Sequence, residues 1–275
     1  MEIRLKAPAK VNLFLEVLGR RPDGYHEVAA VLQEIGLEDD LSAEPAGSFT
    51  LSCSGLAIPE GGGENLVLKA ARLLAREAGV KEGVAFRLHK RIPAGAGLGG
   101  GSSDAAAALK ACCRLWKLDL SAALGTAAAV GSDVPFFLTG GTALCTGRGE
   151  RIERLPSPLS NTEICTEICV VWPGIHLSTQ QVYGAMGGDF SGRKSASEFV
   201  KSLQSKEMHL FNRLEEPALK LRPELGLLRK ALGPGALMSG SGSAFFRLGG
   251  LEKTEIDSPN IKQWQVVRTK IISST

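Results

Sequence analysis

The chain has 275 residues, a length that predicts about two domains. Hydrophobic residues make up 44% of it and charged residues 22%, the ordinary composition of a soluble globular protein. The formal net charge of +3 gives no support for a nucleic-acid or membrane partner, and no apolar run reaches the roughly 18 residues of a membrane span, so we expect a cytoplasmic protein.

Residues 1–90 predict a largely β structure with one helix. Residues 3–19 alternate in polarity and are typical of two strands, which we expect to be broken at Ala7-Pro8. From Glu64 to Gly79 the apolar residues recur with a helical period, and the glycine suits the end of a helix. Residues 84–92 alternate again and predict a strand.

The middle of the chain predicts two helices and then two strands. A helix is expected from about Ser103 to Trp116, and a second from about Ser121 to Val130. The apolar run at 132–138 and the alternating run at 141–147 both indicate strands. A second helix therefore follows the first where a βαβ unit would place a strand.

The last third of the chain mixes both kinds of element. Residues 153–163 contain two closely spaced prolines and are the candidate linker. Residues 168–174 predict a strand, residues 195–208 and 213–232 predict helices, and residues 235–248 predict two strands joined by a glycine-serine loop. Because strands and helices are mixed without a regular alternation, the sequence favours an α+β fold.

The most informative stretch is PAGAGLGGGSSDAAAAL, residues 93–109. Glycine allows positive φ angles and lets a ligand approach the backbone, and the start of a helix offers unpaired N–H donors. Glycines that lead into a helix therefore predict an anion site, most often for phosphate. Ser102 or Ser103 would cap the helix or turn a hydroxyl toward a phosphate or its metal ion, while Asp104 should face away or hold a cation. The alternatives are a flexible linker and a turn required by close packing.

Three familiar phosphate-binding patterns do not fit this loop. Gly95, Gly97 and Gly100 satisfy GxGxxG, but a dinucleotide fold needs a strand after the helix with an acidic residue roughly 20 positions on. Here a second helix is predicted, and Asp119 lies between the two helices. The loop lacks the Gly-Lys-Ser/Thr of a Walker motif, and the chain lacks the catalytic loop of a protein kinase.

The loop closely resembles the phosphate loop of the GHMP small-molecule kinases. APAKVNLFLEVLGRRPDGYHE, GSDVPFFLTGGTALCTGRGE, NRLEEPAL and GALMSGSGSAFF are similar to four further motifs of this family, in the same order. The resemblance implies an N-terminal domain over residues 1–155 that is like domain 2 of ribosomal protein S5. It implies a ferredoxin-like C-terminal domain over residues 156–275. ATP and an acceptor would meet between the two domains.

The resemblance also implies the catalytic groups. Asp133 matches the family's catalytic aspartate, the general base that takes the proton of the acceptor hydroxyl. Lys10 matches the active-site lysine, which would hold Asp133 ionised and orient the acceptor. From the residues alone, Asp133 could also be an aspartate that caps a turn, and Lys10 a solvated lysine on a strand.

The Gly-Tyr-His-Glu segment resembles the branch of the family that acts on a cytidine-diphosphate-linked sugar alcohol. The resemblance implies transfer of the ATP γ-phosphoryl group to the 2-hydroxyl of that acceptor, in non-mevalonate isoprenoid synthesis. His26 would bond to the base, and an aromatic ring would stack on it. From the residues alone, His26 could be a structural histidine. The implied acceptor site comprises Asn12, Tyr25, His26, Thr179 and Tyr183.

For ATP, the resemblance implies that the glycine loop wraps the phosphates, with Lys90 near the nucleotide and SGSGS at 239–243 closing over them. The implied ATP site comprises Lys90, Pro93, Ala94, Gly95, Ala96, Gly97, Leu98, Gly99, Gly100, Gly101, Ser102 and Ser103. ATP would bring Mg²⁺, with Asp104 and the two serines as candidate contacts. From the residues alone, Lys90 could end a strand in solvent, and SGSGS could be a hairpin turn. We expect a monomer or a homodimer.

Three other functions stay open at this point. Another GHMP kinase, acting on homoserine or mevalonate, would share the loop but not the Gly-Tyr-His-Glu segment. A regulator that binds nucleotides without turnover would not need both Lys10 and Asp133. An NAD-binding oxidoreductase would bind a dinucleotide in place of ATP.

Overall fold

The computed structural model describes residues 1–57, 64–157, 167–188, 190, 194–203, 208–249, 251 and 264–272. Contacts divide the chain into two compact units. The first comprises Met1–Ala9, Leu37–Ala94 and Gly99–Gly140, and the second comprises Lys10–Gly36, Gly95–Leu98 and Gly141–Thr275. The predicted division into domains at residue 155 stays a prediction.

The sheet of the first unit is formed by parts of β1 (Ile3–Arg20) and β2 (His26–Ala46) with β3 (Thr50–Gly55) and β4 (Gly83–Lys90). The strand order is β3-β4-β2-β1, in which β2 and β4 are antiparallel and β3 and β4 are parallel. The predicted break at Ala7-Pro8 is wrong, because β1 continues through both residues. Within the described chain β1 is the edge of the sheet at Pro8, and an edge strand tolerates a proline without an N–H group.

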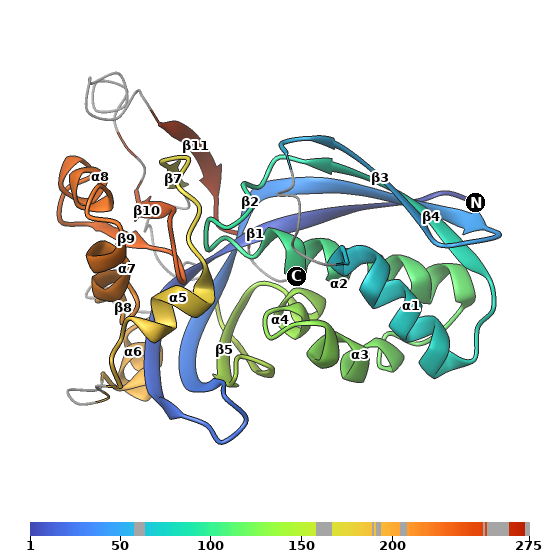
Figure 1. Cartoon of the computed structure of the whole chain (residues 1–275), viewed down its shortest axis with the longest axis horizontal. Helices are drawn as coiled ribbons and strands as arrows, with labels where there is room; N and C mark the ends of the chain where they lie inside the picture. The colour runs from blue at the N-terminus through green and yellow to red at the C-terminus, as the bar shows by residue number, and fades with distance from the viewer. Residues whose placement is uncertain are drawn as a thin grey trace. The chain divides into compact units, whose positions relative to one another are not determined.

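Four helices cover one face of this sheet: α1 (Leu66–Ala78), α2 (Gly100–Trp116), α3 (Ala122–Val130) and α4 (Val134–Thr139) (Figure 1). The predicted helix from Glu64 to Gly79 is confirmed as α1, which ends at Gly79 in the left-handed conformation with φ 69°. The prediction of a strand at 132–138 is wrong, because α4 occupies these residues with Pro135 in its first turn. Every residue from Val134 to Leu138 is buried, so the run has no polar period that could separate helix from strand.

The second unit contains the remaining strands and helices. Its strands are β5 (Thr142–Gly147), β6 (Arg151–Leu155), β7 (Glu167–Trp172), β8 (Phe211–Asn212), β9 (Ala236–Met238), β10 (Phe245–Leu248) and β11 (Gln265–Lys270). Its helices are α5 (Thr179–Gly184), α6 (Ala196–Ser202), α7 (Glu215–Leu221) and α8 (Leu225–Ala231). A four-stranded antiparallel sheet has the order β11-β7-β10-β9, while β5 pairs with β2 and β6.

Two predictions for the last third of the chain need correction. The predicted helix at 213–232 is two helices, α7 and α8, which are separated at Arg222-Pro223 because proline cannot continue a helix. The predicted linker at 153–163 begins inside β6, and its residues 158–163 lie outside the described part of the chain. The predicted hairpin at 235–248 is confirmed as β9 and β10.

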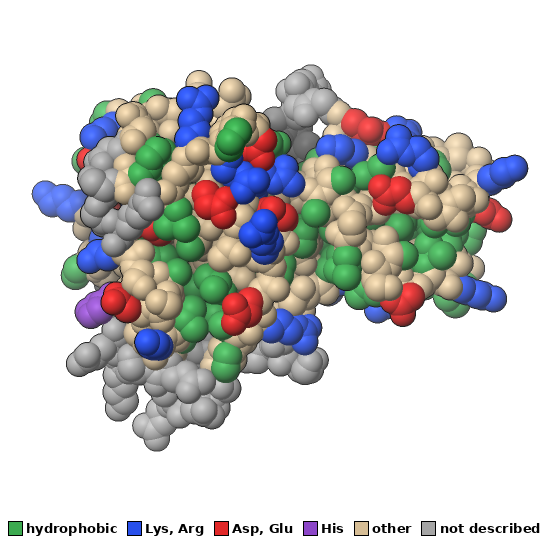
Figure 2. Space-filling view, turned by 90° about the horizontal axis from the view of Figure 1, so that it is seen from below, with side chains coloured by type: hydrophobic (Ala, Val, Ile, Leu, Met, Phe, Trp, Pro, Cys, Tyr) green, Lys and Arg blue, Asp and Glu red, His purple; other side chains and the backbone are tan. Residues whose placement is uncertain are grey.

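The surface charge of one face and the helix lengths bear on the kinds of partner that the protein could bind. On the face shown in Figure 2, basic and acidic side chains are interspersed rather than separated by sign. A mixed surface of this kind produces no strong field of one sign across that face. Among the described residues, no helix has the length and apolar content that would let it cross a bilayer.

Candidate active site

The glycine loop joins β4 to α2, as predicted. Gly95, Gly97 and Gly99 all have positive φ, at 63°, 75° and 72°. At Gly97 the space is also closed, because a Cβ atom there would lie 2.0 Å from the carbonyl oxygen of Ser239. The alternative of a turn required by close packing is therefore correct for Gly97, and it does not exclude a phosphate site formed by the neighbouring amides.

The SGSGS segment at 239–243 contacts the tip of this loop within the second unit. The hydroxyl of Ser239 donates to the carbonyl oxygen of Gly97 at 2.8 Å, and the amide of Ala244 donates to the carbonyl oxygen of Ala96 at 3.0 Å. The side-chain amide of Asn212 donates to the carbonyl oxygens of Met238 and Gly240, both at 2.7 Å. The segment is thus held by the glycine loop and by Asn212. Its closure over ATP stays a prediction.

Lys10 is anchored at the carbonyl oxygen of Gly97, which also accepts from Ser239. Its ammonium donates to Gly97 at 2.8 Å and to the side-chain oxygen of Asn12 at 2.6 Å. The side chain is buried, and the whole residue is 4% exposed, so Lys10 is not a solvated strand lysine. Two residues predicted for different roles, Lys10 and Asn12, are therefore brought together at the glycine loop.

The first turn of α2, in the first unit, has no side-chain cap. The helix begins at Gly100, three residues before the predicted start, and its N-cap residue Gly99 has no side chain to bond the first N–H groups. Neither Ser102 nor Ser103 caps the helix, so that option is excluded. The hydroxyl of Ser103 and one carboxylate oxygen of Asp104 are buried without a partner among the described residues. Uncapped N–H groups at the N-terminus of a long helix attract an anion.

Lys90 lies beneath this helix start, between two carboxylates. Its ammonium bonds to Asp39 and, at 2.6 Å, to Asp104. All three side chains are at most 6% exposed. Burial raises the pKa of Asp104 to about 7, while the charge of Lys90 acts in the opposite direction. Burial lowers the pKa of Lys90, but the two carboxylates outweigh it, so the net change is upward and Lys90 stays charged.

Lys90 is therefore not a strand end in solvent. The predicted contact of its side chain with the nucleotide stays a prediction. Asp104 holds a cation, as expected, and the cation is this ammonium.

Asp133 immediately precedes α4 in the first unit. It occupies the N-cap position of α4, but its side chain makes no capping bond to that helix, which does not support the capping alternative. A Cβ atom at Gly131, two residues earlier, would lie 3.9 Å from the hydroxyl of Ser102. Helices α2 and α4 also pack against each other. Because Asp133 and Lys10 belong to different units, their pairing stays a prediction.

The residues predicted for the acceptor lie in the second unit. The rings of His26 and Tyr183 stack with their centroids 4.7 Å apart. The hydroxyl of Thr179 bonds to that of Ser241 at 2.9 Å. Tyr25 is 52% exposed and does not join the stack described for His26. Burial, together with the charge of Arg20, lowers the pKa of His26, which favours the neutral imidazole that both donates and accepts a hydrogen bond.

Sequence reasoning missed several side chains at these places, among them Arg148 and His176. The guanidinium of Arg148 lies 4.9 Å from the ring centroid of Tyr25, within the range of a cation–π contact. The ring of His176 packs so closely on Gly95 that a Cβ atom there would lie 1.8 Å from it. Arg148 belongs to the GRGE end of a quoted motif, which was a usable signal, whereas nothing around His176 marks it.

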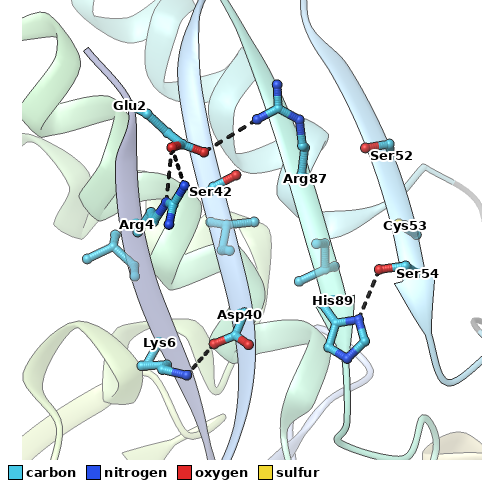
Figure 3. Close-up of a pocket in the computed structure, with 13 residues that line it drawn as sticks. Glu2, Arg4, Lys6, Asp40, Ser42, Ser52, Cys53, Ser54, Arg87 and His89 are labelled. Carbon is cyan, nitrogen blue, oxygen red and sulfur yellow. Dashed lines mark hydrogen bonds and ion pairs between the residues drawn. The ribbon is translucent and has the colours of Figure 1, made fainter.

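A hollow of about 710 Å³ lies over the outer face of the first unit's sheet (Figure 3). Its charged side chains pair among themselves: Arg4 with Glu2, and Lys6 with Asp40. No predicted site residue lines it. Since its charges are already satisfied by one another, this hollow is not the candidate site.

Comparison with known proteins identifies the class. The family model for the N-terminal domain of GHMP kinases matches residues 65–141, which include the glycine loop and Asp133. A crystal structure of 4-(cytidine 5'-diphospho)-2C-methyl-D-erythritol kinase has a TM-score of 0.79 and 38% identity, and the match covers 99% of this chain and 100% of that one. Homoserine kinase from Cytophaga hutchinsonii has a TM-score of 0.66, 18% identity and coverage of 98% and 95%, so it shows the fold alone. The chain therefore has the GHMP kinase fold, with mixed α and β content.

Within this class the relatives are more specific. The 4-diphosphocytidyl-2-C-methyl-D-erythritol kinase of Pelotomaculum thermopropionicum is 44% identical over 263 residues, covering 90% of this chain and 89% of the relative. The chain belongs to the 4-diphosphocytidyl-2-C-methyl-D-erythritol kinase family.

Proposed function

We propose that this enzyme transfers the γ-phosphoryl group of ATP to the 2-hydroxyl of 4-diphosphocytidyl-2-C-methyl-D-erythritol, a step of non-mevalonate isoprenoid precursor synthesis. The observation that carries the proposal is the identity of 44% to a kinase with this name over nine-tenths of the chain. Homoserine kinase, at 18% identity, shares the fold only, which disfavours that alternative.

The glycine loop and the start of α2 are the proposed phosphate site. Gly95, Gly97 and Gly99 have positive φ angles, and the uncapped first turn of α2 offers N–H groups and the positive end of the helix dipole. ATP enters with Mg²⁺, which prefers oxygen ligands and offsets the charge that develops on the phosphoryl group. Ser102 and Ser103 supply hydroxyl oxygens in that first turn, and the buried, unpartnered Ser103 hydroxyl fits this role.

Asp133 is the proposed general base, and Lys10 its partner. Asp133 takes the proton of the acceptor hydroxyl as the oxygen attacks the γ-phosphorus in line, and no phospho-enzyme forms. The ammonium of Lys10, fixed by Asn12 and Gly97, stabilises the ionised carboxylate and orients the acceptor. Retention of both groups argues against a regulator without turnover.

The acceptor's cytosine is the proposed ligand of the aromatic pair in the second unit. Tyr183 and His26 present flat rings, and a neutral His26 can bond to the edge of the base. Tyr25, Thr179 and Asn12 complete the proposed acceptor site. The proposal also keeps the two domains, S5-like over residues 1–155 and ferredoxin-like over residues 156–275, a cytoplasmic location, and a monomer or homodimer.

The test is release of ADP in the presence of a panel of acceptors. We expect release with 4-diphosphocytidyl-2-C-methyl-D-erythritol and background release with homoserine, mevalonate or no acceptor. Asp133→Asn serves as the matched variant, because it keeps the shape of the side chain and removes the base. Release that is independent of the cytidine acceptor would contradict the proposal.

A further inference from the structure

We propose that Asp39 and Asp104 are positioning residues for ATP, which act through Lys90 to hold the two ends of the glycine loop together. The inference rests on the proposed function, because it assigns a further role within the same phosphate site. It concerns three side chains of the first unit, which we call the clamp: Asp39, Lys90 and Asp104. None of the three needs to touch ATP for the clamp to work.

Asp39 holds the end of the loop that leaves β4. One of its carboxylate oxygens accepts from the backbone amides of both Arg91 and Ile92, the latter at 2.9 Å, and the other accepts from Lys90. The register of β2 and β4 pairs Asp40 with His89, which brings the next pair, Asp39 and Lys90, side by side. A buried carboxylate therefore fixes the direction in which the chain leaves the strand.

Asp104 holds the other end, on the first turns of α2. Its carboxylate accepts from the same ammonium at 2.6 Å. A Cβ atom at Gly100 would lie 3.3 Å from that nitrogen and 2.9 Å from Ile92, so the helix start packs directly on the clamp. One lysine thus connects the residues just before the loop with those just after it.

Lys90 is the charged partner that the two carboxylates of the clamp share. Two carboxylates and one ammonium leave the buried clamp with a net charge of −1, and each carboxylate depends on Lys90 for its partner. An ordered loop pays less conformational entropy when it binds a ligand, so loss of the clamp should weaken ATP binding. The chemical step, which depends on groups elsewhere, should change much less.

The test varies ATP at saturating acceptor and measures ADP release by Asp39→Asn, Asp104→Asn and the double variant. Asparagine keeps an acceptor oxygen, so the amides of Arg91 and Ile92 retain a partner. We expect each single variant to raise the KM for ATP by roughly tenfold, with kcat and the acceptor KM within about threefold. Because both act through Lys90, the double variant should raise the KM by less than the product of the two effects. Assays at about pH 8 keep Asp104 ionised, since its pKa is about 7.

The matched control is Asp40→Asn. Asp40 is the neighbour of Asp39 but faces the outer side of the sheet, where it bonds to Lys6 (Figure 3). It also pairs with Arg91. It should leave the KM for ATP unchanged, because an exposed ion pair contributes little. An unchanged KM for ATP in either single clamp variant would overturn the inference, as would a fall in kcat accompanied by equal rises in the KM values for ATP and acceptor.

A thermal-shift measurement with ATP and Mg²⁺ separates this inference from the proposed function. The clamp predicts that Asp39→Asn and Asp104→Asn fold but show a smaller ATP-induced rise in Tm than the wild type. That result would stand even if the wild type failed to phosphorylate the cytidine acceptor. Equal ATP-induced shifts in wild type and variants would refute the clamp while leaving the proposed activity intact.

Discussion

Replacement of Gly97 by alanine tests the described packing of the glycine loop. The added Cβ atom would lie 2.0 Å from the carbonyl oxygen of Ser239 and 3.0 Å from the amide nitrogen of Gly242, both backbone atoms that cannot rotate away. At φ 75° the left-handed conformation alone costs a residue with a Cβ atom about 1–2 kcal/mol. Overpacking adds about 1–3 kcal/mol, so the free energy of unfolding should fall by about 2–5 kcal/mol.

The assay is thermal unfolding together with the KM for ATP. For a chain of this size the expected loss corresponds to a fall in Tm of about 5–15 °C. If the loop moves to relieve the contact, Gly97 can no longer accept from Lys10 and Ser239, and the KM for ATP should rise by roughly tenfold. Gly125→Ala is the control, because this exposed position in α3 has open space and Ala favours a helix. A Gly97→Ala protein with unchanged Tm and unchanged KM for ATP would contradict the close contact between Gly97 and Ser239.

Three other predictions follow from the site. Asp133→Asn should lower kcat by roughly a hundred- to ten-thousand-fold in the ADP-release assay, and near-normal turnover would remove it as the base. His26→Ala should raise the KM for the cytidine acceptor far more than the KM for ATP, and an equal rise in both would argue against a contact with the base. Because the pKa of Asp104 is raised from 3.8 to about 7, the folded protein binds a proton at this carboxyl that the unfolded chain releases, so the contribution of Asp104 to stability should fall as pH rises from about 4 to about 7. Urea unfolding across this range should show the free energy of unfolding of the wild type falling relative to that of Asp104→Asn as pH rises, and parallel curves would contradict the prediction.

Local patterns were enough to predict several parts of the fold. The helical period and terminal glycine of α1, the alternation of β4 and the hairpin of β9 and β10 all lie within single short segments. The glycine loop could also be placed between a strand and a helix, because glycine clusters and alanine-rich helices are both local signals. These features depend little on residues elsewhere in the chain.

Features that depend on tertiary position could not be predicted in this way. Pro8 reads as a strand break, but it is tolerated because β1 is a sheet edge there, which only the strand order reveals. The run before Thr139 reads as a strand because its residues are all apolar, although it is a buried helix. Asp39 lies outside the motifs that the sequence offers, and its bond to Lys90 joins residues 51 positions apart in the chain. The role of such a side chain becomes visible only when the register of β2 and β4 is known.

We infer that the glycine loop presents ATP to an alcohol whose proton is taken by Asp133. Mass and ³¹P NMR spectra of the product formed from 4-diphosphocytidyl-2-C-methyl-D-erythritol and ATP test this most directly. We expect one added phosphoryl group as a monoester on the 2-hydroxyl, formed by the wild type and nearly lost in Asp133→Asn. Consumption of ATP without a phosphorylated acceptor, or the same yield from the variant, would contradict it.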